Sequence, residues 1–383
     1  MKPTDLRVAL FSGNYNYVRD GANQALNMLV GYLLRQGVTV RVYSPTTKTP
    51  AFEPTGDLVS VPALPIPGGR GEYKFAWRLA PETRADLEAF APNIIHVTAP
   101  EVLGHRAVTW ARERGLATIS SLHTRFETYP AYYHLTFLVP LMIKGMTRFY
   151  NRVDQVVTPG QSTADILREW GVETPIRIWA RGVDHARFNP GMRSQEWRRS
   201  LGLAGEEFAV GFLGRLVLEK GLDIFAEVCR TLTSRGVPHR VLVIGDGPAR
   251  EWFAGQVPEA VFAGFQRGDD LGRAVASMDV LFNPSVTETF GNVTLEAMAC
   301  GIPVVAARAT GAVDLIEDGV NGFLVPPRDV SAYADAIARL AEDAELRRAQ
   351  SHAGHQKAQA YQWDDINQVV LDTYLEVMER RGK

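Results

Sequence analysis

The residues between 283 and 305 combine two carboxylates with a helix start, and together they could bind an extended ligand that carries phosphate and hydroxyl groups. Glu288 lies in a polar loop, and Glu296 follows eight residues later in a predicted helix. Carboxylates repel a phosphate, so both would instead accept hydrogen bonds from hydroxyl groups at the two ends of the ligand. The phosphate would lie between them, at the unpaired backbone N–H groups of the helix start. These N–H groups belong to Phe290, Gly291, Asn292 and Val293. A nucleotide sugar, with a sugar at one end and a ribose at the other, has this arrangement.

Two buried strands must hold this segment in place. Residues 280–282 are apolar and short, and the sequence Asn-Pro-Ser at 283–285 ends them, which predicts a strand. Asn292 is the predicted N-cap of a helix that Gly301 ends before a second apolar run at 302–305. The pattern predicts a βαβ unit. The alternative is an ordinary βαβ unit whose two carboxylates are only solvated.

Other polar residues follow predicted strands at the edge where open α/β sheets bind ligands. Arg215 and Lys220 lie between an apolar run at 208–213 and a predicted helix, so two cations could hold a diphosphate. The alternative is a surface ion pair with Glu219. His123 follows the apolar run at 118–122 and could face the same ligand, or could be a histidine with a structural role only.

Strands and helices alternate along the whole chain, which predicts an α/β fold with doubly wound parallel sheets. Apolar runs at 6–11 and 38–43 flank a helical period at 25–34, and Gly21 lies at the loop-to-helix junction. The dinucleotide fingerprint G-x-G-x-x-G is absent from the sequence. Gly21 could allow close approach of the backbone to a diphosphate, or could serve only the turn.

Length and composition predict a globular protein of two domains, which we expect to be cytoplasmic. The chain has 383 residues, 46% hydrophobic and 22% charged, and two cysteines. We expect no signal peptide, because the N-terminal residues enter a predicted strand directly, and the sequence contains no apolar run long enough to span a membrane. Residues 1–190 carry 21 Lys and Arg against 16 Asp and Glu, a net charge of +5, and the remainder carries 20 against 27, a net of −7. We expect no nucleic-acid partner.

Residues 132–152 combine apolar side chains with three cations at four-residue spacing. Lys144, Arg148 and Arg152 would form one stripe on a helix that Pro140 kinks. Such a stripe could dock the protein on the anionic inner face of a membrane. The alternative is a core helix with a solvated basic edge.

The motifs resemble those of the family-4 retaining glycosyltransferases. Four motifs carry the resemblance, which covers essentially the whole chain. They are E-x7-E with its helix and the sequence GIPVVA, the G-R-x(4)-K-G element around Arg215, S-x-H-T around His123, and GVDHARFNP at 182–190. It implies the GT-B fold of two Rossmann-like domains facing across a cleft. The acceptor domain would be 1–190, the donor domain 191–360, and a C-terminal helix at 361–383 would return to the first domain.

The resemblance also implies roles for the residues. Glu288 would contact the transferred sugar, Glu296 the ribose hydroxyls, and His123 the sugar and diphosphate. Arg215 and Lys220 would hold the diphosphate, and the loop at Phe265 would contact the base. Gly21 matches a glycine-rich turn that closes on the donor, although Asp20 replaces the usual second glycine.

The implied reaction transfers a hexose with retention of configuration. Residues 132–152 and the sequences GVDHARFNP and RSQEWRR look similar to mannosyl- and sulfoquinovosyltransferases that act on membrane lipids, so GDP-mannose and a lipid or glycolipid are the expected substrates. Alternatives are a sulfoquinovosyl-, glucosyl- or glucuronosyltransferase that uses a UDP-sugar, a nucleotide-sugar 2-epimerase, or a non-catalytic sensor. The sequence has no D-x-D motif, so we expect no metal and no other cofactor.

Overall fold

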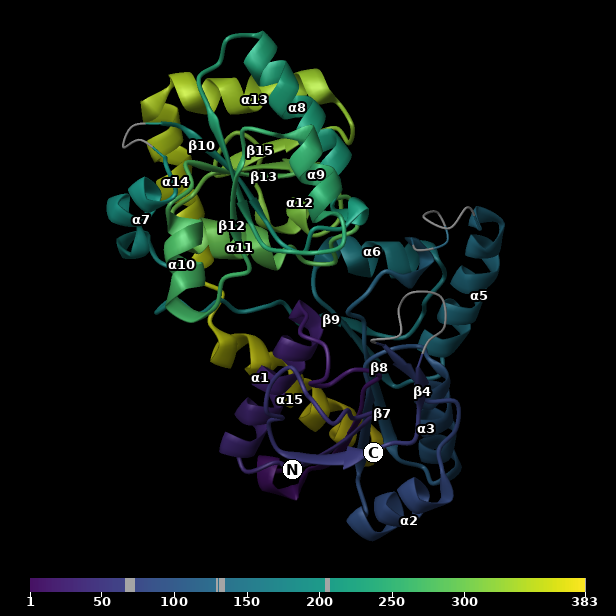
Figure 1. Ribbon diagram of the computed structural model, residues 1–383. Coiled ribbons are helices and arrows are strands. Elements are labelled where there is room, and N and C mark those ends of the chain that lie inside the picture. The colour runs from purple at the N-terminus through teal and green to yellow at the C-terminus, as the bar shows by residue number, and fades with distance from the viewer. Residues whose placement is uncertain (66–72, 129, 131–134, 204–206, 383) are drawn as a thin grey trace. The chain divides into compact units, whose positions relative to one another are not determined.

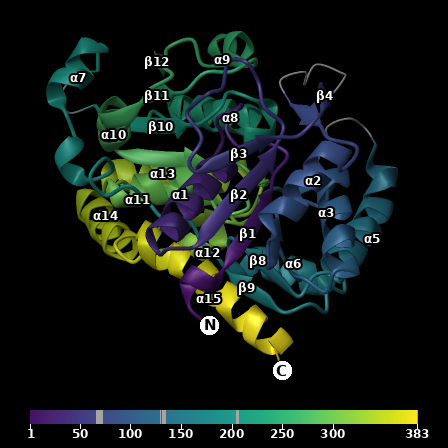
Figure 2. The same cartoon turned by 90° about the horizontal axis from the view of Figure 1, so that it is seen from below.

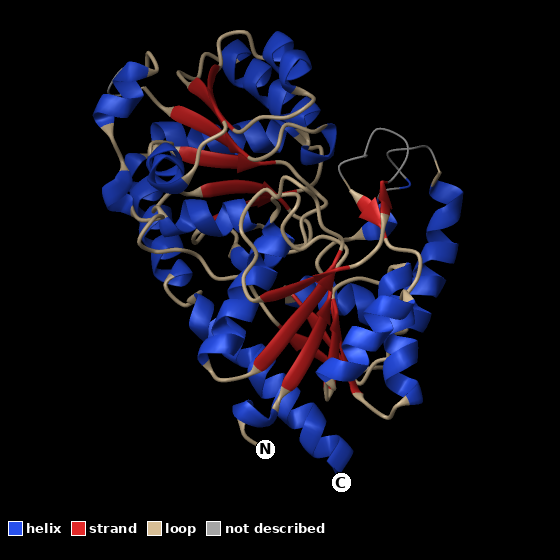
Figure 3. Cartoon of the chain, turned by 60° about the horizontal axis from the view of Figure 1, so that its bottom comes forward, coloured by secondary structure: helices blue, strands red, loops and turns tan. Residues whose placement is uncertain are grey.

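The computed structural model describes residues 1–65, 73–128, 130, 135–203 and 207–382. The chain forms two compact units, residues Met1–Arg181 with Trp363–Lys383, and residues Gly182–Gln362. Each unit is an α/β domain built on a parallel sheet, as the alternation of strands and helices predicted (Figure 3).

Unit 1 contains a sheet of seven parallel strands among the described residues. Successive residues of its central strand point to opposite faces, so Ala9 and Phe11 enter one core and Val8 and Leu10 another. The strand order across the sheet is β3 (Asp57–Ser60), β2 (Thr39–Ser44), β1 (Arg7–Phe11), β6 (Ile94–Val97), β7 (Ala117–Ser121), β8 (Gln155–Thr158) and β9 (Ile176–Ile178). A separate antiparallel pair consists of β4 (Leu64–Pro65) and β5 (Lys74–Phe75).

Helices cover both faces of this sheet. The described helices of unit 1 are α1 (Gly21–Arg35), α2 (Pro81–Phe90), α3 (Val102–Glu113), α5 (Val139–Tyr150), α6 (Gln161–Glu169) and α15 (Trp363–Gly382), with 3-10 turns η1 (Pro3–Asp5), η2 (Phe126–Thr128) and η3 (Thr136–Leu138). The helices α1 and α15 contact one another (Figures 1 and 2) and pack into the core that contains Val8 and Leu10. The helices α2, α3 and α5 contribute to the core on the other face.

Unit 2 contains six parallel strands among the described residues. Their order is β12 (Val261–Gly264), β11 (Arg240–Ile244), β10 (Ala209–Leu213), β13 (Val280–Asn283), β14 (Val304–Ala307) and β15 (Gly322–Val325). The described helices are α7 (Gln195–Ser200), α8 (Leu222–Ser234), α9 (Arg250–Gln256), α10 (Gly268–Ala276), α11 (Asn292–Ala299), α12 (Ala312–Leu315), α13 (Val330–Glu342) and α14 (Ala344–Ala358), with η4 (Pro190–Met192) and η5 (Leu218–Lys220). One core contains buried residues of α8, α9 and α13, and α11 packs on α14.

The chain leaves unit 1 at Arg181, earlier than the boundary predicted at residue 190. Residues 182–190 already belong to unit 2 because they pack there. The Val183 N–H donates to the Tyr361 carbonyl (3.0 Å), and the Arg187 backbone lies so close to Gly272 that a Cβ on this glycine would be 2.1 Å from the Arg187 carbonyl oxygen. At the other end, α15 belongs to unit 1, where the sequence placed a returning C-terminal helix.

Two local predictions need correction. Pro140 does not kink a helix, because α5 begins at Val139 and places the proline in its first turn, where the missing N–H has no cost. The part of the predicted helix at 132–134 lies outside the described residues. Among the described residues, no helix is both long enough and apolar enough to cross a membrane.

Candidate functional site

The predicted donor-binding residues of unit 2 follow strands of one parallel sheet. Arg215 and Lys220 follow β10, Phe265 follows β12, and Glu288 follows β13. Since β10 and β13 are parallel neighbours, their carboxyl ends lie at the same edge of the sheet. This is the edge at which open α/β sheets bind ligands.

A close contact at this edge joins Lys220 and Glu288. The Lys220 Nζ donates to the Glu288 Oε1 at 2.5 Å, with 33% of the lysine side chain and 16% of the glutamate side chain exposed. Lys220 therefore pairs with Glu288. The contact draws the loop after β10 onto the loop after β13. Arg215 is exposed at the same edge.

The turn between Lys220 and α8 fits this close approach. Gly221, the N-cap of α8, has φ 73, which favours glycine, and a Cβ there would be 3.1 Å from the Pro284 carbonyl oxygen. A larger residue at 221 would push the two loops apart. The close approach of these two loops thus depends on the glycine at position 221.

The start of α11 differs from the prediction by one residue. Gly291, and not Asn292, is the N-cap, because the chain turns there with φ 91, a conformation that glycine adopts without strain. The first helical hydrogen bond runs from the Leu295 N–H to the Gly291 carbonyl (3.1 Å). The N–H groups of Asn292 and Val293 precede it and lie in the first turn, where a phosphate could accept from them.

Phe290 can offer a ligand only its backbone. Its side chain is 4% exposed, and its ring centroid lies 6.0 Å from that of Tyr361. Gly311 packs on the same backbone, since a Cβ on this glycine would be 2.8 Å from the Phe290 carbonyl carbon. The aromatic side chain therefore fixes the turn at the start of α11.

Glu296 projects from α11 into an environment that disfavours its charge. Burial raises the pKa of Glu296 to about 8, and the nearby Arg187 guanidinium lowers it only in part. The carboxyl group is therefore largely protonated at neutral pH and can both donate to and accept from hydroxyl groups.

Phe265 is exposed where the sequence predicted a contact with the base. The side chain is 55% exposed, and the Arg267 guanidinium lies 5.0 Å from its ring centroid. An exposed ring with a stacked guanidinium offers a flat surface to a heteroaromatic base. The sequence pattern did not single out Arg267, which contacts Phe265.

His123 lies at the carboxyl end of β7 in unit 1, as predicted, and both of its ring nitrogens have protein partners. The Arg181 Nη2 donates to Nδ1 (2.9 Å), and Nε2 lies 2.7 Å from the Ser121 Oγ. The Trp179 ring contacts the imidazole edge to face, with 5.4 Å between centroids. Burial, Arg181 and His96 hold the pKa of His123 well below its usual range.

Gly21 is the first residue of α1, but the helix N-terminus there already has an anionic cap. The Asp20 carboxylate accepts from the Asn23 N–H (2.8 Å), and the Asn23 side chain accepts from the Asp20 N–H (3.2 Å). This capping box stabilises the helix start. A diphosphate at the same N–H groups would meet the charge of Asp20, which replaces the second glycine of the family turn.

Sequence reasoning assigned no role to Glu101, which lies at the same edge of unit 1. Its carboxyl group packs on Gly13, where a Cβ would be 2.5 Å from both carboxyl oxygens. Burial raises the pKa of Glu101 to about 7, and the Gly13 N–H lowers it in part. The available signal was its position just after the strand at 94–97.

The predicted basic stripe is only partly present. Lys144 and Arg148 are exposed on α5, but Arg152 turns inward, where its Nη2 donates to the Thr109 Oγ1 (2.7 Å) and its Nη1 lies 3.3 Å from the His105 Nδ1. Arg152 follows the end of α5 at Tyr150, so it no longer continues the helical spacing. Exposed apolar residues accompany the two remaining cations: Leu135 (41%), Phe137 (72%) and Leu141 (68%).

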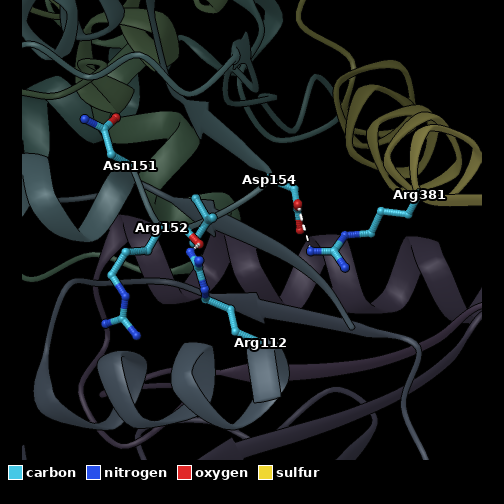
Figure 4. A pocket seen from close by; sticks show the side chains of 6 residues that line it. Arg112, Asn151, Arg152, Asp154 and Arg381 are labelled. Atoms are coloured by element: carbon cyan, nitrogen blue, oxygen red, sulfur yellow. Dashed lines mark hydrogen bonds and ion pairs between the residues drawn. The ribbon is translucent and has the colours of Figure 1, made fainter. Parts of the chain in front are cut away.

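Arg152 instead lines a polar surface pocket of about 250 Å³ (Figure 4). The Asp154 carboxylate accepts from the Arg381 Nη2 (2.9 Å), and the Arg112 Nη1 donates to the Arg152 carbonyl (2.8 Å). Asp154 immediately precedes β8, so the pocket lies at the amino end of that strand, opposite the edge that carries His123. Its charges are largely used within the protein, and we assign it no role in the reaction.

Comparisons with known proteins identify the class that this fold and these motifs define. The profile described as "Glycosyltransferase Family 4" matches residues 19–187, and that of "Glycosyl transferases group 1" matches residues 207–343. A GDP-mannose-dependent alpha-mannosyltransferase of Corynebacterium glutamicum is 32% identical over 298 residues, which cover 78% of this chain and 71% of the relative. Sulfoquinovosyl transferase SQD2 of Arabidopsis thaliana is 32% identical over 369 residues, which cover 93% of this chain and 71% of the relative.

Solved structures share the fold. Sucrose-phosphate synthase from Thermosynechococcus elongatus superposes with a TM-score of 0.81 at 21% identity, covering 98% of this chain and all of that one. HepE of Anabaena, solved with UDP and glucose, superposes with a TM-score of 0.76 at 21% identity, covering 96% of this chain and 99% of that one. The chain has the GT-B fold and belongs to the family-4 glycosyltransferases. It is a glycosyltransferase.

Proposed function

We propose that the protein transfers a hexose from a nucleotide-sugar donor, with retention of configuration, and that unit 2 binds the donor. The observation that carries this proposal is the 2.5 Å contact between Lys220 and Glu288. It places a cation that can neutralise a phosphate beside a carboxylate that can accept from sugar hydroxyls. These are the two groups that must act on either side of the bond that breaks.

The proposed roles follow from position. Arg215, Lys220 and the first turn of α11 stabilise the leaving diphosphate, which in transfer reactions is usually the largest contribution to catalysis. Glu288 orients the sugar, and Glu296 accepts from the ribose. When the donor binds, Lys220 exchanges part of its contact with Glu288 for the phosphate, so the pair is the resting arrangement of the site. By the family resemblance, His123 is also proposed to take part in transfer.

Mannose from GDP-mannose is the proposed donor sugar. The support is the similarity to relatives named as GDP-mannose-dependent alpha-mannosyltransferases, one of which from Mycolicibacterium smegmatis matches over 98% of this chain at 28% identity. The similarity to a sulfoquinovosyl transferase keeps a UDP-sugar as the alternative. Arg267 favours guanine, because a guanidinium can donate two parallel hydrogen bonds to the O6 and N7 of this base.

A membrane lipid or glycolipid is the proposed acceptor, and the protein is peripheral on the inner face of the membrane. The support is the exposed face that we call the α5 face, made of Phe137, Leu141, Lys144 and Arg148. On α5, Leu141, Lys144 and Arg148 have the spacing of one helix face, so apolar and cationic side chains project together. This combination fits an anionic bilayer surface.

The test supplies the purified enzyme with GDP-mannose, UDP-sulfoquinovose, UDP-glucose and UDP-glucuronate, each with and without a total lipid extract, and analyses the products by mass spectrometry. We expect one donor to be consumed and its sugar to appear on a lipid. Consumption without any acceptor, or of none of the donors, would contradict the proposal. The same reaction after chelation should keep its rate, because cations of the protein replace a metal at the diphosphate. A loss of activity that added Mg²⁺ or Mn²⁺ reverses would show that a metal binds at the diphosphate.

A further inference from the structure

A chain of buried hydrogen bonds crosses unit 1 behind His123. Arg181 contacts His123, which contacts the Ser121 Oγ, and the same Oγ lies 3.0 Å from the His96 Nε2. The His96 Nδ1 lies 2.6 Å from the Tyr374 hydroxyl of α15. His96 and Tyr374 have no exposed surface. The contacts join the ends of β6 and β7, the segment after β9, and the C-terminal helix.

Arg181 is the fixed end of this chain. It is 3% exposed, and its Nη1 donates to the backbone carbonyls of Trp179 (2.9 Å) and Ala180 (3.0 Å). Its guanidinium carbon lies 4.8 Å from the Trp179 ring centroid. Two carbonyl contacts and a stacked ring hold the guanidinium in one orientation, with Nη2 directed at the Nδ1 of His123.

The direction of one hydrogen bond decides the state of His123. A guanidinium has only donors, so Nδ1 must be the acceptor and cannot carry a proton. The neutral ring then carries its proton on Nε2, which donates to the Ser121 Oγ. A doubly protonated ring would direct an N–H at the N–H of Arg181. The charged groups closest along the chain, Arg125 and Glu127, pair with one another at 2.6 Å.

We infer that Arg181 is a positioning residue that holds His123 as the uncharged tautomer with its proton on Nε2. His123 is then neither a general acid nor a general base, because it cannot take up a proton without losing its contact with Arg181. It acts as a fixed dipole at the carboxyl end of β7. The inference about the tautomer is independent of the proposed function, whereas its consequence for turnover rests on the role proposed there for His123.

The direct test is nitrogen-15 NMR of the full-length protein with labelled histidines, with His123 assigned by its loss in His123→Gln. In the wild type at pH 7 we expect a protonated Nε2 and an unprotonated Nδ1. In Ser121→Ala the tautomer should persist, because Arg181 sets it. In Arg181→Met, which keeps the length but removes the donors, the proton should no longer be confined to Nε2, and the two nitrogen signals should move toward those of a mixture of tautomers. A proton on Nδ1 in the wild type, or a tautomer that changes in Ser121→Ala, would overturn the inference without needing the arginine variant to fold.

The kinetic arm measures kcat and KM for the donor from pH 5.5 to 8. Burial, the largest cause of the low pKa of His123, remains in Arg181→Met, so kcat should fall across the whole pH range as the fixed tautomer is lost, and the fall should deepen toward pH 5.5, where Arg181 no longer opposes protonation of the ring. Arg181→Lys should restore part of the loss, because lysine is also only a donor. Arg177→Met, which removes an exposed pair with Glu376, is the matched control and should leave the profile unchanged.

The two arms separate the inference from the proposed function. An Arg181→Met protein whose NMR signals show a changed tautomer but whose kcat is unchanged would support the tautomer assignment and refute a role of His123 in transfer. An Arg181→Met protein whose His123 signals do not change would overturn the inference itself.

Discussion

At the scale of single residues, the predicted site becomes specific where two side chains from distant loops meet. Lys220 and Glu288 were predicted separately, as a phosphate ligand and a sugar ligand. Sequence spacing could not show that they contact one another, because 68 residues separate them and the contact depends on the pairing of β10 with β13. Each of the two side chains balances the charge of the other. A substitution of one therefore also leaves the other without its partner.

Lys220→Ala should lower turnover by on the order of a hundredfold, because it removes a cation from the leaving diphosphate. The measurement is kcat for the donor identified by the panel, with circular dichroism to show that the variant is folded. Arg235→Ala is the matched control, since Arg235 forms a pair of similar length with Asp335 (2.6 Å) elsewhere in unit 2. Near-normal turnover in a folded Lys220→Ala protein would refute the assignment.

The two glutamates should separate in a binding experiment. Glu296→Ala should weaken binding of the free nucleoside diphosphate, because it removes both the donor and the acceptor assigned to the ribose, whereas Glu288→Gln should spare binding and lose mainly transfer. Isothermal titration calorimetry with GDP and UDP measures the first effect, and turnover measures the second. An equal loss of nucleoside diphosphate affinity in both variants would contradict the assignment of Glu288 to the sugar and Glu296 to the ribose.

At the scale of elements, the sequence predicts the strands well because each is a short apolar run buried in a parallel sheet. Element ends were less predictable. Asn292 has the chemistry of an N-cap, but the chain needs a left-handed residue at this turn, and Gly291 supplies it with φ 91. Arg152 has the spacing of a stripe, but α5 ends before it, and the side chain finds partners on α3. Backbone conformation and helix length decided these cases, and neither is visible in residue spacing.

The α5 face makes a prediction at this scale. Lys144→Gln with Arg148→Gln should weaken binding to anionic vesicles about thirtyfold, since two cations contribute about 2 kcal/mol together near such a surface. Replacing Phe137 and Leu141 by Ser should weaken binding further, because these side chains would insert at the interface. Sedimentation with anionic and neutral vesicles, at low and high salt, measures both effects.

The control for charge alone is Lys48→Gln with Arg84→Gln, which removes two exposed cations elsewhere in unit 1. This control should bind like the wild type. If it weakens binding as much as the α5 variant, the net charge of unit 1 and not the α5 face attracts the vesicles. If no protein binds, the face is a solvated helix edge and a soluble acceptor such as a sugar or polyol is the better interpretation.

At the scale of the whole molecule, unit 1 is discontinuous in sequence, and its last element completes the interior behind His123. Tyr374 reaches His96 across 278 residues of sequence, and Trp179 donates to Asn367 at 3.2 Å. The sequence predicted a returning helix from the family resemblance, but it gave no sign of the polar contacts that this helix makes. A buried histidine inside an apolar strand, such as His96, looks like a core residue until its partners are known.

This polar interior predicts how unit 1 responds to acid. Burial lowers the pKa of His96 to about 3, and the pKa of His123 is also well below 6.5. In the unfolded chain both rings take up a proton below about pH 6.5, whereas in the folded unit they do not, so the free energy of unfolding falls as the pH drops. Each of the two rings should lower the free energy of unfolding by about 2 kcal/mol between pH 7 and pH 5. Glu101 opposes this loss, because its raised pKa of about 7 means that the folded unit gains stability as the same carboxyl group is protonated.

Because Glu101 opposes the two histidines, the contribution of His96 is measured as a difference in stability between a variant and the wild type. His96→Gln should lose less stability between pH 7 and pH 5 than the wild type does, by about 2 kcal/mol, whatever the sum of the other titrating groups. Hydrogen exchange of the amides in β6 and β7 measures the stability of unit 1 alone. Unfolding of unit 2 does not affect this measurement. His352→Gln, at an exposed position on α14, is the control and should follow the wild type. If the pH dependence of exchange is the same in His96→Gln and in the wild type, His96 is not held uncharged in the fold, and the buried hydrogen bonds from Tyr374 to Arg181 do not form the connected chain described above.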